Sequence, residues 1–176
     1  MTETIILVDE NDNEIGTEEK IKAHEEGKLH RAFSIFLFNS RGRMLITRRA
    51  KTKYHCGGMW TNTCCSHPKP GESVEEAAHR RLREEMGIDC DMKELFSFIY
   101  KAEFDNGLSE HEFDHVLVGK FDGEPRPDPE EADDWRWVSV EELEKEIHDS
   151  EKYTPWFQIA FNKLSEKNIS SILNGQ

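Results

Sequence analysis

Residues 66–88 read S-H-P-K-P-G-E-S-V-E-E-A-A-H-R-R-L-R-E-E-M-G-I and contain the most strongly patterned helix of the chain. Ser73 and Glu76 have the spacing of a capping box, in which each side chain accepts a hydrogen bond from the backbone N–H of the other residue. Gly87 can end the helix in the left-handed conformation. Apolar residues recur at helical spacing at Val74, Ala77, Ala78, Leu82 and Met86. The stretch therefore predicts an amphipathic helix whose two ends are fixed by sequence.

The charged residues of this helix fall on two faces. Glu76, Arg80 and Glu84 lie four residues apart, so we expect exposed ion pairs among them. Arg81 and Glu85 instead lie on the ridge of Ala77, at the edge of the buried face. A charged side chain in that position needs a partner or a ligand.

Residues 59–68, M-W-T-N-T-C-C-S-H-P, lead into this helix and predict a strand over 59–65. Successive residues of a strand face opposite sides, so Cys65 and His67 share a face and Cys64 faces away. A cysteine pair in a strand is more often buried packing than a reactive group. The stretch by itself leaves metal ligation, nucleophilic chemistry and core packing open.

The other elements predict a mixed sheet with packed helices. A turn is expected at 10–16, a hairpin between 32–38 and 43–49, and a second turn at Asn106-Gly107. Strands are expected at 4–9, 32–38, 43–49, 91–104, 110–121 and 134–140. Helices are expected at 18–27, after 140, and from Thr154-Pro155 onward, where proline suits the first helical position.

Composition narrows the class of protein. The chain has 176 residues and a formal net charge of −13, which argues against a nucleic-acid-binding surface. It has no run of 18 apolar residues, and its first residues lack the basic and apolar regions of a secretory signal. We therefore expect a cytoplasmic protein without membrane contact, with reduced cysteines. The basic stretch R-R-A-K-T-K at 48–53 would suit an anionic ligand only if other features converge on it.

Residues 66–88 resemble the Nudix box, G-x5-E-x7-R-E-U-x-E-E-x-G-U, where U is bulky and apolar. The matching residues are Glu72, Arg80, Leu82, Glu84, Glu85, Gly87 and Ile88. Ser66 replaces the first glycine, and Arg81 replaces the first glutamate of R-E-U-x-E-E. In Nudix hydrolases this helix holds divalent metal through carboxylates, which hard cations prefer. An arginine at this position should impair a hydrolase.

The wider sequence resembles the type 1 isopentenyl-diphosphate isomerases, Nudix members that leave the diphosphate intact. The resemblance runs from about Lys20 to the last helix and rests on K-I-K-A-H, L-H-R-A-F, L-I-T-R-R-A-K-T-K, W-T-N-T-C-C-S-H-P, G-E-S, E-H-E and T-P-W. It implies an α/β fold with a Nudix-type mixed β-sheet core sandwiched between helices. We expect one Nudix domain over 1–176, with an N-terminal strand and helix extension and C-terminal helices.

The isomerase resemblance also implies catalytic groups. Cys65 holds the place of the family's cysteine, two residues before a histidine, and Glu112 holds the place of its acid–base partner. Tyr100 matches a tyrosine that assists proton transfer. Trp156 matches a tryptophan whose ring face would stabilise a carbocation. Without the resemblance, Tyr100 and Trp156 would be interpreted as packing residues.

The same resemblance implies a metal site and a diphosphate site. The metal ligands would be His24, His30, His67, Glu110 and Glu112, with manganese, magnesium or zinc as the ion. The strand alternation of E-H-E places both of these glutamates on one face. A second ion, magnesium on Glu85, would bridge to the diphosphate, which would be held by Lys20, Arg49, Lys53 and Arg81. No flavin is implied, and His55, His111 and His115 match no ligand of the family.

The expected activity is the interconversion of isopentenyl and dimethylallyl diphosphate through a tertiary carbocation. The expected partner is this small substrate, without nucleic acid or membrane, in a monomer or weak homodimer. One alternative is a Nudix pyrophosphohydrolase, against which Arg81 argues. The other is a non-enzymatic metal- or ligand-binding module, which would not need Cys65 and Glu112.

Overall fold

A central strand organises the computed structural model, which describes residues 2–174. This strand, β3 (His30–Phe38), pairs in parallel with β8 (Ser109–Lys120) and antiparallel with β6 (Cys64–Ser66). Strand β7 (Met92–Glu103) continues the sheet beyond β8 as an antiparallel hairpin. The catalytic candidates of β6 and β8 therefore lie on the two neighbours of one strand.

The rest of the sheet is antiparallel. Strand β4 (Met44–Arg49) pairs with β9 (Ala132–Val138) and with the short β5 (Trp60–Thr61). Strands β1 (Thr4–Val8) and β2 (Glu14–Glu19) form a hairpin, and β1 contacts β3 through Leu7 and His30. The predicted hairpin between β3 and β4 pairs only at Phe38 and Met44, because β4 then turns to pair with β9.

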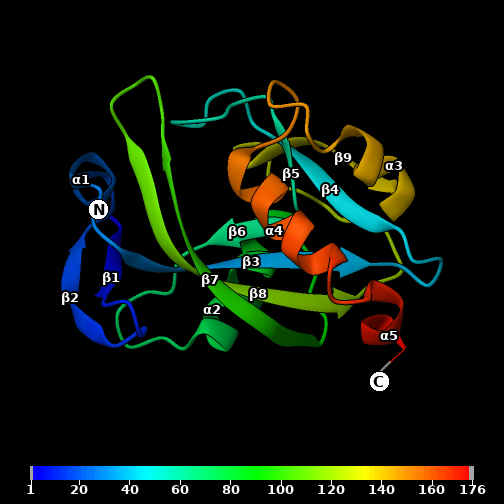
Figure 1. Cartoon of the computed structure of the whole chain (residues 1–176), viewed down its shortest axis with the longest axis horizontal. Helices are drawn as coiled ribbons and strands as arrows, with labels where there is room; N and C mark the ends of the chain where they lie inside the picture. Colours follow the sequence, from blue (N-terminus) through cyan, green and yellow to red (C-terminus); the bar gives the residue numbers. More distant parts are fainter. Residues whose placement is uncertain (1, 175–176) are drawn as a thin grey trace.

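Helices cover both faces of this sheet, which confirms the predicted α/β sandwich. The helices are α1 (Lys20–Glu26), α2 (Val74–Met86), α3 (Val140–Glu146), α4 (Pro155–Ser165) and α5 (Ile169–Leu173). Alternate residues of β3 pack on opposite layers: Phe33 and Ile35 on the side of α2, Phe36 and Phe38 on the side of α4. Figure 1 shows α4 lying across the sheet and the β7–β8 hairpin extending past it toward α1.

Helix α2 forms as its sequence predicts. Ser73 and Glu76 make the capping box, and Gly87 ends the helix with φ of 65°. Its buried residues are Ala77, Ala78, Leu82 and Met86. The expected Glu76–Arg80 pairing is replaced, since Glu76 caps the helix and Arg80 pairs with Glu72 at 2.7 Å and Glu84 at 3.3 Å.

Three boundaries differ from the sequence prediction. Strand β2 occupies 14–19, where a turn and the first residues of a helix were expected, because it pairs along β1. The strand predicted over 59–65 is interrupted at 62–63, whose side chains bond to the backbones of neighbouring strands. Helix α5 follows α4 and was not predicted. In residues 2–174 no helix combines the length and apolar character that crossing a membrane requires.

Candidate active site

A cavity of about 240 Å³ opens where β6, β8, α2 and the start of α4 meet. Every site residue predicted from the sequence lines it, except His24 and His30, which lie behind it fully buried. The lining includes Cys65, Tyr100, Glu112 and Trp156, together with the four predicted diphosphate-binding residues. The structure therefore brings together groups that the sequence spreads from residue 20 to residue 156.

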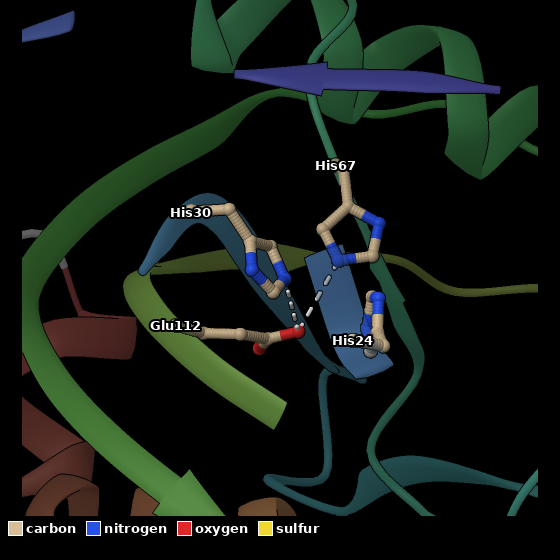
Figure 2. A group of neighbouring side chains, drawn as sticks. All are labelled: His24, His30, His67 and Glu112. Atoms are coloured by element: carbon tan, nitrogen blue, oxygen red, sulfur yellow. Dashed lines mark hydrogen bonds and ion pairs between the residues drawn. The ribbon is translucent and has the colours of Figure 1, made fainter. Parts of the chain in front are cut away.

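Four of the predicted metal ligands form one buried cluster (Figure 2). His24 comes from α1, His30 from the first residue of β3, His67 from the segment after β6, and Glu112 from β8. Glu112 Oε1 lies 3.2 Å from His67 Nε2 and 3.6 Å from His30 Nε2. One ligand atom from each of the four lies within 4.8 Å of the others.

Backbone carbonyls fix two of these imidazoles. His24 Nδ1 lies 2.6 Å from the carbonyl oxygen of Lys20, and His30 Nδ1 lies 2.8 Å from that of Lys28. A carbonyl only accepts, so each Nδ1 carries its proton toward the backbone. Both Nε2 atoms are buried without a hydrogen-bond partner among the described residues. Imidazoles oriented in this way around a carboxylate fit a divalent metal ion.

Burial and mutual contact set the protonation of the cluster. Burial lowers the pKa of His24 to about 4, with the neighbouring His67 and His30 lowering it further. Burial also lowers the pKa of His67. For Glu112, burial acts to raise the pKa, but the neighbouring imidazoles of His30 and His67 outweigh it and hold the pKa well below its usual range. For His30, burial acts to lower the pKa, but the contact with Glu112 outweighs it and raises the pKa. Metal binds neutral imidazoles and an ionised carboxylate, so an ion in this cluster would displace the proton that Glu112 favours on His30.

The fifth predicted ligand, Glu110, lies in an adjoining group with His24 and His55. His55 Nε2 is 2.6 Å from Glu110 Oε1, and Tyr100 donates its hydroxyl hydrogen to Glu110 Oε2. Glu110 and Glu112 are both buried and both line the cavity, as the strand alternation predicted. His55, which matched no ligand of the family, therefore lies beside one.

Cys65 is held in the cavity wall by buried polar groups. Its Sγ lies 3.0 Å from Asn62 Oδ1 and 3.5 Å from Ser34 Oγ, and Ser34 in turn donates to Asp114 at 2.7 Å. Burial raises the pKa of the Cys65 thiol, and the nearby Asp114 raises it further. The thiol is thus neutral and carries a proton. Cys64 packs toward α2 instead, with its Sγ 3.4 Å from Glu85 Oε2, so the two cysteines point to opposite layers as predicted. Cys64 nevertheless also lines the cavity, on the side of Glu85.

Trp156 stands at the first turn of α4, with 3% of its surface exposed. The guanidinium carbon of Arg49 lies 5.1 Å from the centroid of its ring. The His55 ring centroid is 5.4 Å away. The ring is therefore positioned to attract cations.

Four of the six basic residues that line the cavity, Lys20, Lys53, Arg80 and Arg81, are paired with carboxylates. Lys53 contacts Glu131 at 2.6 Å, and Lys20 contacts Glu3 at 2.9 Å. Arg81 contacts Glu84 at 2.6 Å, Glu131 at 3.2 Å, and also Glu85. The sequence predicted that Arg81 and Glu85 need partners, and they are partners of each other.

The lining holds six carboxylates and six lysine or arginine residues. The carboxylates are Glu3, Glu84, Glu85, Glu110, Glu112 and Glu131, and the cations are Lys20, Arg49, Lys53, Lys69, Arg80 and Arg81. With these charges balanced, a diphosphate would gain little net attraction from the protein alone. Divalent ions on the carboxylates would tip the balance toward an anionic ligand.

Sequence reasoning missed several groups of the site. Asp114 could have been predicted from the sequence, because it lies two residues after Glu112 and so on the same face of the strand as Glu110 and Glu112. Asn62 lies inside the W-T-N motif but was not assigned a role. Glu131 had no local signal, since it lies in an irregular segment before β9 and reaches the cavity through the pairing of β9 with β4.

Residues 28–157 match the NUDIX domain family. A protein of Aromatoleum aromaticum named isopentenyl-diphosphate Delta-isomerase 2 is 52% identical over 165 residues, which cover 93% of this chain and 87% of that protein. The isopentenyl-diphosphate Delta-isomerase of Serratia proteamaculans is 51% identical over 170 residues, covering 96% and 95%.

Solved structures share the fold at lower identity. The crystal structure of DR0079 from Deinococcus radiodurans has a TM-score of 0.77 at 24% identity, covering 92% of this chain and 98% of that chain. The structure of a MutT protein from Methanosarcina mazei has a TM-score of 0.66 at 20% identity, covering 80% and 95%.

Proposed function

The chain belongs to the isopentenyl-diphosphate Delta-isomerases of the NUDIX domain family, and we propose that it interconverts isopentenyl and dimethylallyl diphosphate. The observation that carries this proposal is the placement of a thiol and a carboxylate, Cys65 and Glu112, in the wall of one cavity that also carries basic residues. A double-bond shift needs a proton added at one carbon and another removed nearby, and these two groups can supply that exchange.

The positions of the two groups suit a substrate bound between them. Cys65 is paired with Ser34 of β3, and Glu112 with His30, four residues earlier on the same strand. At the rise of a β-strand this is an offset of roughly 13 Å along the backbone. The side chains would reach into that space from the two neighbours of β3, toward the alkene.

Tyr100 and Trp156 would assist Cys65 and Glu112 in the part of the cavity where the alkene reacts. Tyr100 donates a hydrogen bond to Glu110, and burial raises the pKa of its hydroxyl, with Glu110 raising it further, so it stays protonated. The Trp156 ring would face the tertiary carbocation and stabilise it by cation–π attraction. Burial of this wall would also keep water from trapping the cation.

His24, His30, His67, Glu110 and Glu112 would hold one divalent ion. Imidazole with carboxylate suits manganese or zinc, and magnesium is a further candidate. When bound, the ion would stabilise the ionised form of Glu112 and so tune its proton affinity.

Lys20, Arg49, Lys53 and Arg81 would bind the diphosphate. Arginine gives forked, charge-assisted hydrogen bonds to phosphate oxygens, so Arg81 would help to hold the group intact. Glu85 would hold a magnesium ion that accompanies the diphosphate. Arg81 stands where a hydrolase has a glutamate and contacts Glu84, Glu85 and Glu131, which disfavours the hydrolase alternative.

Phosphorus NMR of the purified protein with isopentenyl diphosphate, Mn²⁺ and Mg²⁺ tests this proposal. An isomerase leaves both phosphorus signals of a diphosphate ester while the organic product changes. Release of inorganic phosphate or of a monophosphate ester would favour the pyrophosphohydrolase and overturn the proposal.

A further inference from the structure

His55 is a buried histidine that the proposed reaction does not use. Its side chain is 3% exposed, and its ring stacks on Phe104 with centroids 4.6 Å apart and planes inclined by 29°. The loop that carries it lies between β4 and β5 and lines the cavity. A buried imidazole normally has polar partners for its ring nitrogens.

Arg49 fixes the tautomer of this ring. A terminal nitrogen of Arg49 lies 3.3 Å from His55 Nδ1, and the same guanidinium approaches the His55 carbonyl oxygen at 3.3 Å. A guanidinium only donates, so Nδ1 is an acceptor in this contact. In the neutral ring the proton therefore sits on Nε2.

The protonated Nε2 lies beside Glu110. The distance from Nε2 to Glu110 Oε1 is 2.6 Å, whereas Tyr100 donates to Oε2 of the same carboxylate. The Nε2 contact is close without the alignment of a full hydrogen bond. Both oxygens of Glu110 are thus contacted by groups that carry a proton, and these contacts restrict the orientation of the carboxylate.

We propose that His55 is a positioning residue of the metal centre, which holds the Glu110 carboxylate for the ion in an orientation that Arg49 sets. The inference rests on the proposed metal centre. It links a predicted diphosphate-binding residue, Arg49, to a predicted metal ligand, Glu110, through a single imidazole. Outer groups that orient a ligand in this way typically contribute about 10–100-fold to metal affinity.

Direct ligation by His55 is the competing arrangement. It would need a lone pair on Nε2 and a proton on Nδ1, and that proton would face the N–H of Arg49. Two donors facing each other at 3.3 Å are repulsive, so the geometry favours the positioning role.

The test measures Mn²⁺ binding without substrate, so it is independent of isomerase activity. Metal-free full-length protein is titrated with Mn²⁺, and the free ion is followed by electron paramagnetic resonance. The variants are His55→Ala, His55→Gln, whose amide N–H can replace Nε2–H, and His148→Ala, a control at an exposed histidine. Visible absorption of the Co²⁺-loaded proteins reports the ligand set.

We expect His55→Ala to weaken Mn²⁺ binding by about 10–100-fold. His55→Gln should restore most of the affinity, His148→Ala should bind as the unsubstituted protein does, and the Co²⁺ bands should keep their positions throughout. Unchanged affinity in His55→Ala would overturn the proposal. So would a glutamine variant as weak as the alanine variant with shifted Co²⁺ bands, because that result identifies a direct ligand. If the unsubstituted protein binds no Mn²⁺, the metal centre itself fails, and this inference with it.

Discussion

Asn62 connects the backbone of the central strand to the proposed catalytic thiol. Its amide nitrogen donates to the carbonyl oxygens of Ile35 and Cys64, at 3.1 and 3.0 Å. This orientation leaves Oδ1 as the acceptor, 3.0 Å from Cys65 Sγ. The side chain has no solvent exposure, so water cannot replace these hydrogen bonds if the amide rotates. Asn62 therefore limits where the Cys65 proton can point.

Replacing Asn62 by alanine should lower both activity and stability. The two carbonyl oxygens would lose buried donors, at a cost of about 1–3 kcal/mol in the free energy of unfolding for each group left unpaired. The thiol would also lose its orientation, so we expect kcat to fall more than KM changes. Steady-state kinetics and chemical denaturation of Asn62→Ala measure the two effects.

Thr63→Val is the matched control for this prediction. Thr63 donates to the carbonyl oxygen of Leu45 and accepts from the N–H of Leu37, so its loss removes buried hydrogen bonds beside Asn62 without touching Sγ. We expect a comparable loss of stability with a smaller loss of kcat. Equal kcat losses in the two variants would mean that the contact between Asn62 and Cys65 does not orient the thiol for catalysis.

At the level of residues, the sequence predicted groups that stand in short local patterns. Cys65 and His67 are two residues apart in the sequence, and so are Glu110 and Glu112. Residues two apart in a strand point to the same face of the sheet, so each pair could be placed on one face from the sequence. Glu131 could not be found this way, since its place depends on a loop after a distant strand. The role of His55 depends on the meeting of its loop with β8.

Helix α2 uses one face for packing and the edge of that face for the cavity. Its buried stripe packs on β3 and β4, whereas Arg81 and Glu85 reach the cavity from the edge of that stripe. The C-terminal end of α2 lies against the segment before β9, where Arg126 donates its N–H to the carbonyl oxygen of Met86. The end of this helix therefore helps to place the Glu131 segment.

Gly87→Ala tests this close approach. Gly87 has φ of 65°, and a Cβ there would lie 2.8 Å from the carbonyl oxygen of Arg126. The left-handed conformation should cost about 1–2 kcal/mol for alanine. Overpacking against the neighbouring segment should add about 1–3 kcal/mol. Thermal unfolding measures the sum.

Gly71→Ala serves as the comparison for Gly87→Ala. Gly71 has φ of 83°, and apart from its chain neighbours no atom of the described residues lies within 4 Å of where a Cβ would stand. Gly71→Ala should lower the free energy of unfolding only by the cost of the left-handed conformation, about 1–2 kcal/mol. Equal destabilisation of the two variants would show that the contact with Arg126 does not restrain the helix end.

Elements defined by local chemistry were predictable from sequence, and those defined by partners were not. The capping box and Gly87 fixed α2, and Asn106-Gly107 fixed the β7–β8 turn. Strand β2 carries few apolar residues and forms because β1 offers a partner, so its own pattern could not indicate it. The break between β5 and β6 follows from side-chain bonds of Asn62 and Thr63 to other strands.

The whole molecule gathers its metal candidates from four separate segments. Helix α1, β3, the segment after β6, and β8 each contribute one residue to the His24, His30, His67 and Glu112 cluster. Ser109 Oγ also donates to the carbonyl oxygen of His24, which ties α1 to the β7–β8 hairpin. An ion bound in this cluster would link the N-terminal segment to the sheet.

Metal should therefore stabilise the folded chain. At a concentration 100 times its dissociation constant, an ion that binds only the folded state adds about 2.7 kcal/mol. For a domain of this size that corresponds to a rise in Tm of about 5–10 °C. Differential scanning calorimetry of chelator-treated protein with increasing Mn²⁺ measures it.

The His67→Ala variant is the control for metal stabilisation. It removes one imidazole of the cluster, so its Tm should respond only weakly to Mn²⁺. A Tm that does not change with Mn²⁺ in the unsubstituted protein would contradict the metal centre. An equal response in both proteins would place the ion elsewhere.

The most direct measurement of the central claim is proton NMR of isopentenyl diphosphate incubated in deuterated water with the Mn²⁺- and Mg²⁺-loaded protein. The proposed mechanism predicts dimethylallyl diphosphate carrying deuterium. It also predicts that Cys65→Ala, with its metal content checked, is slower by about 10²–10⁴-fold, the usual contribution of a general acid or base. Unchanged substrate with the loaded protein, or an alanine variant as fast as the original, would contradict the assignment of this cavity as a thiol–carboxylate isomerase site.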